Sequence, residues 1–126
     1  MTQQINFLIL EDSKVFSELV SNKAERLGFN VSICTKGEEA LNLAEQQKFA
    51  VICVHYYLPD MTVEEFCLDI RALPHLENVH ILLITSEQKP ELLRKALEAG
   101  VTEIFSKNSI EPIERYLSHY IEDNVY

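Results

Sequence analysis

Polar side chains that can bind a cation or an anionic group follow four apolar runs of this sequence. Glu11 and Asp12 follow residues 5–10, His55 follows residues 49–54, Thr85 follows residues 79–84, and Lys107 comes shortly after residues 101–105. Carboxylates are hard oxygen ligands for divalent cations, whereas imidazole suits borderline metals or carries protons. A hydroxyl and an ammonium group can hold an anionic oxygen. If the four runs end together, these side chains share one pocket.

The apolar runs have the length and pattern of strands, and the segments between them have those of helices. Residues 49–54 are apolar without alternation, which predicts a strand buried on both faces of a parallel sheet. The other predicted strands are 5–10, 29–34, 79–84 and 101–105, and the predicted helices are 14–27, 38–47, 62–73, 91–99 and 110–121. Strands that alternate with helices imply right-handed crossovers and a parallel sheet covered on both faces. Ligands of such sheets bind at the carboxyl ends of the strands, where the polar side chains lie.

The composition predicts a single domain that spans residues 1–126, because 126 residues of which 47% are hydrophobic can bury one core. A net charge of -9 opposes binding to nucleic acid or anionic lipid, so we expect protein or cation partners. The N-terminus lacks a signal-peptide pattern and no apolar stretch is long enough to span a membrane, so we expect a cytoplasmic location. Cys34, Cys53 and Cys67 fall inside apolar stretches and are expected to be reduced core residues.

The order and spacing of these motifs resemble the receiver domain of two-component response regulators along essentially the whole chain. The segment 8–13, Leu-Ile-Leu-Glu-Asp-Ser, is similar to the acidic pair that follows the first strand of that family. The segment 83–86, Leu-Ile-Thr-Ser, resembles its hydroxyl-bearing strand, and residues 100–107 match its GxxxxxxK pattern. The resemblance implies the flavodoxin-like receiver fold, an α/β, doubly wound, five-stranded parallel sheet with strand order 2-1-3-4-5.

The sequence departs from the family at the position that the chemistry requires most. In the family, the residue three before Leu-Pro is the aspartate that accepts a phosphoryl group. Here Leu58-Pro59 fixes the register, and the residue at that position is His55. In addition, residues 60–63 replace the usual Gly-Met-Asp-Gly, Ile104 stands at the position of the aromatic switch residue, and Asn108 replaces a proline.

The resemblance implies a role for each of the other polar residues. Thr85 and Lys107 are the equivalents of the phosphoryl-pocket residues. Glu11 and Asp12, with the backbone carbonyl of Tyr57 as a possible third ligand, are the equivalents of the Mg²⁺ site. Because an imidazole replaces a carboxylate, we expect this Mg²⁺ site to be weak or lost and no cofactor to be required. Without a carboxylate nucleophile we also expect no aspartyl phosphate, no catalytic residue and no enzymatic activity.

Three interpretations of His55 are open at this point. It can be a structural replacement, an imidazolium that gains proton affinity beside two carboxylates and takes the place of the missing metal. It can join Glu11 and Asp12 in a one-histidine, two-carboxylate site for Zn²⁺, Mn²⁺ or Fe²⁺. It can also accept a phosphoryl group itself, although no neighbouring residue resembles a phosphohistidine site.

The expected function is that of a pseudo-receiver in a phosphorelay, acting as a protein-interaction or dimerisation module. Its expected partners are a histidine kinase, an output domain or a second copy of the chain, and not nucleic acid or a membrane. In the family the interaction face comprises the fourth helix, fifth strand and fifth helix, here about residues 90–121. The candidate contact residues on it are Leu92, Leu93, Ala96, Ile110, Ile113 and Tyr116. The alternatives are a conventional response regulator that is still modifiable and a metal-binding sensor or enzyme that uses Glu11, Asp12 and His55.

Overall fold

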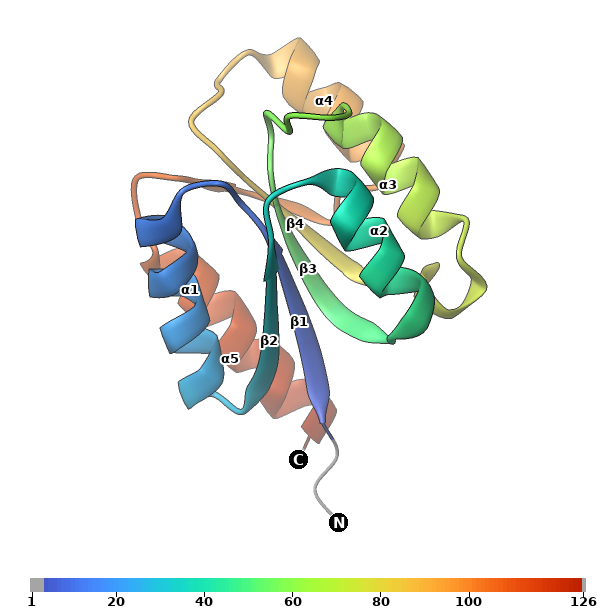
Figure 1. The fold of residues 1–126 in the computed structure, drawn as a ribbon. Coiled ribbons are helices and arrows are strands. Elements are labelled where there is room, and N and C mark those ends of the chain that lie inside the picture. The colour runs from blue at the N-terminus through green and yellow to red at the C-terminus, as the bar shows by residue number, and fades with distance from the viewer. Residues whose placement is uncertain (1–3, 126) are drawn as a thin grey trace.

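The computed structural model describes residues 4–125 and has the predicted doubly wound fold (Figure 1). The strands are β1 (Ile5–Leu10), β2 (Phe29–Cys34), β3 (Phe49–His55), β4 (His80–Thr85) and β5 (Glu103–Ser106). The helices are α1 (Lys14–Arg26), α2 (Gly37–Gln46), α3 (Val63–Arg71), α4 (Pro90–Ala99) and α5 (Glu111–Val125), with a short 3₁₀ helix, η1 (Pro74–Leu76). The strands pair in parallel in the order β2-β1-β3-β4-β5, which confirms the predicted topology.

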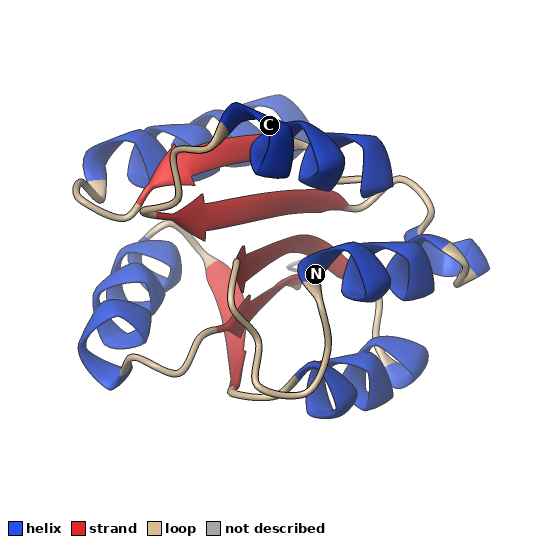
Figure 2. Ribbon diagram, turned by 90° about the horizontal axis from the view of Figure 1, so that it is seen from above, coloured by secondary structure: helices blue, strands red, loops and turns tan. Residues whose placement is uncertain are grey.

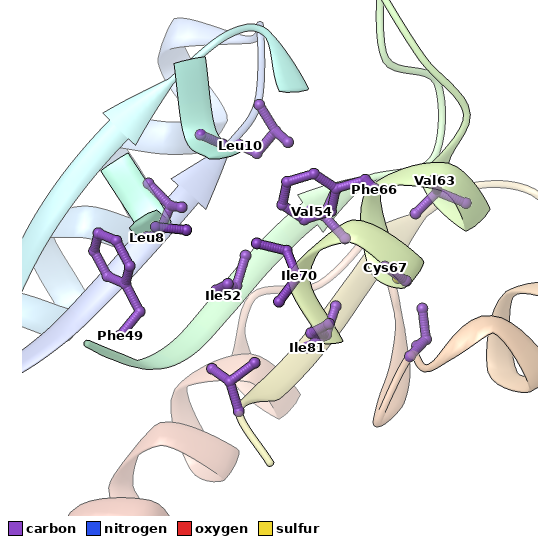
Figure 3. Packing of buried hydrophobic residues seen from close by; sticks show 14 of the residues in the cluster. Leu8, Leu10, Phe49, Ile52, Val54, Val63, Phe66, Cys67, Ile70 and Ile81 are labelled. Carbon is purple, nitrogen blue, oxygen red and sulfur yellow. The ribbon is translucent and has the colours of Figure 1, made fainter. Parts of the chain in front are cut away.

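Helices cover both faces of the sheet, so that the central strands are buried between two layers (Figure 2). Side chains of β1, β3 and β4 alternate between two apolar clusters, as expected for strands whose successive residues point to opposite faces. Leu8, Ile52 and Ile81 belong to the cluster on the side of α2, α3 and α4, which also contains Phe66 and Ile70 of α3 (Figure 3). The residues between them pack against α1 and α5 in the second cluster. The continuous apolar runs of the sequence follow from this two-sided burial.

The element boundaries differ from the predicted ones at several ends. The helix predicted to reach residue 73 stops at Arg71, and η1 follows because Pro74 has no amide hydrogen with which to continue an α-helix. The last helix continues past the predicted residue 121 to Val125, since no glycine or proline follows to end it. The fifth strand begins at Glu103 rather than residue 101, because the amide of Val101 bonds to the carbonyl of Ala96 in the preceding turn.

The loop after β3 is fastened to the start of α2. The two carboxylate oxygens of Asp60 accept hydrogen bonds from the amides of Gly37 (2.9 Å) and Glu38 (3.0 Å). These bonds lower the pKa of Asp60, because they favour the charged carboxylate at a helix N-terminus. Met61 packs so closely on Gly37 that a side chain there would collide with its sulfur atom. The backbone that leaves His55 is therefore held in place.

The three cysteines are free and buried, as the sequence predicted for core residues. Burial raises the pKa of the Cys67 thiol to about 12, so it is protonated at neutral pH. Within residues 4–125, no helix combines the length and the apolar character that crossing a bilayer requires.

Candidate functional site

The carboxyl ends of β1, β3 and β5 bring three ionisable side chains to one carboxylate oxygen. Glu11 follows β1, and its side chain is only 3% exposed. The Nζ atom of Lys107, just after β5, lies 2.9 Å from Glu11 Oε1. The Nδ1 atom of His55, the last residue of β3, lies 3.5 Å from the same oxygen and 3.4 Å from Lys107 Nζ. The convergence predicted for Glu11, His55 and Lys107 is therefore present.

The two oxygens of Glu11 have different environments. Oε2 accepts a hydrogen bond from the amide of Ser13 (2.9 Å), and the hydroxyl of Ser13 in turn caps α1 by accepting from the amide of Phe16 (3.3 Å). Oε1 is fully buried, and Lys107 neutralises it as an ion pair without the alignment of a hydrogen bond. The start of α1 thus fixes the carboxylate, with one oxygen directed into the pocket.

Burial lowers the pKa of His55, and this differs from the increased proton affinity that the sequence suggested. The negative charge of Glu11 opposes the effect of burial, but the positive charge of Lys107 adds to it. The sequence argument placed the imidazolium beside two carboxylates and did not include an ammonium group at contact distance. Because Lys107 already balances Glu11, a proton on the half-buried ring has little to gain. The structure therefore favours a neutral imidazole at position 55.

Asp12 and Thr85 lie at the edge of this group. Asp12 is exposed, and ligand atoms of Glu11, Asp12 and His55 lie within 4.8 Å of one another. Thr85 is buried at the end of β4, where its hydroxyl oxygen accepts a hydrogen bond from the amide of Glu87 (2.9 Å). Within the described residues, the Thr85 hydroxyl therefore bonds to the loop after β4 and not to Glu11, His55 or Lys107. Asp12 joins the charged group as predicted, and Thr85 borders it.

Comparison with known families decides what kind of domain this is. The sequence profile of the response regulator receiver domain matches residues 7–116. The chain belongs to this family. It is therefore a receiver domain of two-component signalling, with the fold, strand order and acidic pair expected of one.

The receiver domain is similar to several proteins in both sequence and fold. It is 28% identical to the chemotaxis protein CheY-3 of Vibrio cholerae over 102 residues, which are 80% of this chain and 78% of that protein. It is 26% identical to the signal transduction histidine-protein kinase BarA of Escherichia coli K12 over 112 residues, or 89% of this chain. The match spans only 12% of the length of BarA.

A solved structure has the same fold at lower sequence identity. The receiver domain of the sensor histidine kinase PA1611 from Pseudomonas aeruginosa PAO1 superposes with a TM-score of 0.82 at 23% identity. The match covers 95% of this chain and 99% of that one. That structure has a magnesium ion coordinated in its active-site cleft.

A bridge across the rim of the receiver pocket was not predicted. The hydroxyl of Tyr57 donates a hydrogen bond to Glu87 Oε1 (2.9 Å), which joins the loop after β3 to the loop after β4. The other oxygen of Glu87 accepts from the amides of Gln88 and Lys89, at the start of α4. The signal in the sequence was an acidic residue three positions before Pro90, which occupies a helix first turn. From the sequence, Tyr57 was expected only to offer its backbone carbonyl as a possible metal ligand.

The face expected to bind partners is smaller than the sequence suggested. Ala96 and Ile113 are completely buried in the two core clusters, so they are not available as contact residues. Leu92, Leu93, Ile110 and Tyr116 are partly exposed, and they remain candidates. Ile104, at the position of the aromatic switch residue, is also partly exposed and packs against the cluster under α2, α3 and α4.

Proposed function

We propose that this receiver domain does not form an aspartyl phosphate and acts as a protein-interaction module in a two-component pathway. The observation that carries the proposal is His55, which ends β3 beside Glu11 and Lys107 where the family has its acceptor aspartate. An imidazole cannot form the acyl phosphate, because that bond requires a carboxylate oxygen as nucleophile. On this proposal residues 1–126 are one pseudo-receiver domain without enzymatic activity.

The nearest aspartate in the sequence has a different function. Asp60 lies beyond Pro59, and both of its oxygens are bonded to amides at the start of α2. To accept a phosphoryl group it would have to leave that helix and pass the proline. Asp60 therefore supports the loop and does not replace the missing acceptor.

The charges of the pocket do not suit Mg²⁺. Mg²⁺ prefers near-octahedral oxygen coordination, but the available side chains are two carboxylates and an imidazole, with the Tyr57 carbonyl as a possible addition. One oxygen of Glu11 already accepts from Ser13, and Lys107 neutralises the other at 2.9 Å. The ammonium group of Lys107 thus supplies positive charge that a bound Mg²⁺ would otherwise supply. We infer that Mg²⁺ binds weakly and that the fold does not require it.

Two contacts favour a single arrangement of the loops around the pocket. The amide of Glu87 bonds to Thr85, and the carboxylate of Glu87 bonds to Tyr57. With Ile104 in place of the aromatic switch residue, the chain also lacks the side chain that the family uses for its readout. A domain fixed in one state acts by binding, and its partners are a histidine kinase, an output domain or a second copy. We assign this binding to the exposed part of α4, β5 and α5.

Reaction with a small phosphodonor tests the loss of chemistry. The receiver domain is incubated with acetyl phosphate and Mg²⁺, and its intact mass is measured beside that of His55→Asp. We expect no phosphoryl adduct on the unmodified chain. An adduct that persists in a His55→Asn variant would show another acceptor, and an adduct that this variant abolishes would make His55 the acceptor. Either result contradicts the proposal.

Light scattering tests the interaction face. Leu92→Glu and Ile110→Glu place charge on α4 and just before α5, and Val15→Glu on α1 is the matched control because Val15 is 72% exposed. We expect self-association, or binding to a candidate kinase, to be weakened by the first two substitutions and unchanged by the control. A chain that is monomeric and binds the kinase equally with all three substitutions would refute the assigned face.

A further inference from the structure

We propose that Glu11, Asp12 and His55 bind a borderline transition-metal ion, with Zn²⁺ as the reference, in preference to Mg²⁺. This inference rests on the proposed function, because it concerns the same pocket without an acceptor aspartate. The three side chains come from the ends of two neighbouring strands, β1 and β3, which pair in parallel. Their ligand atoms lie within 4.8 Å of one another.

Glu11 provides a second, independent indication of a ligand. Its side chain is only 3% exposed, and within the described residues Oε1 is a buried atom without a hydrogen bond. Buried polar atoms are nearly always hydrogen-bonded, so such an atom requires an explanation. Oε1 points toward His55 Nδ1 at 3.5 Å, with the ion pair to Lys107 beside it. A metal ion bound to both atoms would give this oxygen a directed bond, which the ion pair to Lys107 does not supply.

The types of ligand select the metal. Imidazole nitrogen suits Zn²⁺ and similar ions, whereas Mg²⁺ is bound by oxygen. Zn²⁺ takes nitrogen and carboxylate ligands at about 2.0–2.2 Å, which places the donor atoms roughly 3 to 4 Å from one another. The separation of Glu11 Oε1 and His55 Nδ1 falls in this range. Asp12 is exposed and can close the remaining distance by rotating its side chain.

Lys107 must move for the metal to bind. Its Nζ lies 2.9 Å from Glu11 Oε1, so a cation at that oxygen would be repelled by the ammonium group. The side chain is 24% exposed, and Nζ lies 5.2 Å from the centre of the Phe16 ring on α1. Because the side chain reaches solvent, it can turn outward when a metal ion takes its place. Lys107 therefore competes with the metal, and its removal should tighten metal binding.

Titrations with Zn²⁺ and with Co²⁺ test the site on residues 1–126. Calorimetry measures the affinity for Zn²⁺, and the visible absorption of bound Co²⁺ reports nitrogen and oxygen coordination. We expect one Zn²⁺ per chain, with affinity reduced at least tenfold by His55→Ala and by Asp12→Asn. Because Asp12 is exposed, Asp12→Asn should fold even if His55→Ala does not. His119→Ala is the matched control, since His119 is exposed on α5 and lies near His80, at the opposite end of the sheet from the pocket.

Further measurements test whether the site prefers Zn²⁺ to Mg²⁺, and they separate this inference from the proposed function. We expect Lys107→Met to bind Zn²⁺ at least tenfold more tightly, and a large excess of Mg²⁺ not to displace the Zn²⁺. The inference would be overturned if neither the unmodified chain nor Lys107→Met bound Zn²⁺. It would also be overturned if Zn²⁺ binding survived Asp12→Asn and His55→Ala. The phosphodonor experiment does not depend on Zn²⁺. A chain that gains no phosphoryl group and binds no Zn²⁺ would contradict the metal site and leave the proposed function intact.

Discussion

His55 and His80 are two half-buried histidines at opposite ends of the sheet, and they have different surroundings. His80 begins β4, where its Nδ1 lies 2.5 Å from the hydroxyl of Tyr116 and the rings of Tyr116 and Tyr120 pack edge-on against it. His55 ends β3, where its Nδ1 lies close to a carboxylate and an ammonium group. Burial lowers the pKa of both residues. Burial alone therefore does not distinguish the histidine beside the charged groups of the pocket from the histidine that packs against two tyrosines.

The groups around the two histidines show where the difference lies. At the amino end of the sheet, Arg71 donates hydrogen bonds to the carbonyls of Glu77, Val79 and Gly100. Its guanidinium therefore joins the segment before β4 to the turn before β5. At the carboxyl end, Oε1 of Glu11 is buried with an ion pair only. One end uses its polar groups to hold backbone together. The other holds a charge that depends on neighbouring charges, and this dependence is typical of a binding site.

The largest effect on stability is expected at the carboxyl end. Lys107→Met leaves the Glu11 carboxylate buried without a counter-charge, and we expect it to lower the free energy of unfolding by about 3 kcal/mol. Lys23→Met is the matched control, because Lys23 pairs with Glu114 at 3.6 Å with both side chains about a third exposed. That exposed pair should contribute less than about 1 kcal/mol. Urea denaturation measures both values, and equal losses would show that Glu11 does not depend on Lys107.

A smaller effect is expected at the amino end. Arg71→Met removes the donors to three backbone carbonyls but leaves no buried charge behind. We expect a loss of about 2 kcal/mol, because each carbonyl loses a charge-assisted hydrogen bond but some of them regain water. Arg94→Met on the exposed face of α4, where Arg94 is 71% exposed, is the control. A loss for Arg71→Met larger than that for Lys107→Met would reverse the proposed order of the two ends.

The smallest effect is a change in the pH dependence of stability. Burial and the charge of Arg71 lower the pKa of His80, so below about pH 6.5 the unfolded chain binds a proton that the folded chain does not. The contribution of His80 to the free energy of unfolding should therefore be fully present above that pH and be lost as the pH decreases. His80→Phe should therefore reduce the slope of stability against pH. Chemical denaturation measures the free energy of unfolding between about pH 5 and pH 8, which is roughly the range in which histidine titrates. Equal slopes for His80→Phe and the unmodified chain would contradict the role of His80.

The fold and the convergence of the site could be predicted because both depend on local pattern. Apolar runs identified the five strands, and Gly28 and Gly100, which have positive φ angles of 104° and 127°, correctly marked two helix ends. A parallel sheet then places the residues after its strands at one edge. This reasoning was sufficient to bring Glu11, His55 and Lys107 together.

Contacts between distant segments could not be predicted from the pattern. The carboxylate of Asp60 caps a helix that begins 23 residues earlier, and Tyr57 bonds to Glu87 across 30 residues. Only the folded backbone brings such pairs within reach. The protonation of His55 was misjudged for the same reason. The pattern placed Lys107 in the pocket but did not show that its ammonium group touches the same oxygen as the imidazole.

Thermal melting of the unmodified chain and of His55→Asp, each with EDTA and with Mg²⁺, tests the central claim most directly. In the variant three carboxylates meet at one place, so we expect a lower melting temperature in EDTA than in Mg²⁺. At an Mg²⁺ concentration 100 times its Kd the gain is about 2.7 kcal/mol. The unmodified chain should change little, because on this account His55 replaces an oxygen ligand and Lys107 neutralises Glu11, so that Mg²⁺ binds weakly. Equal stabilisation of both proteins by Mg²⁺ would contradict the account, since position 55 would then not be the missing ligand.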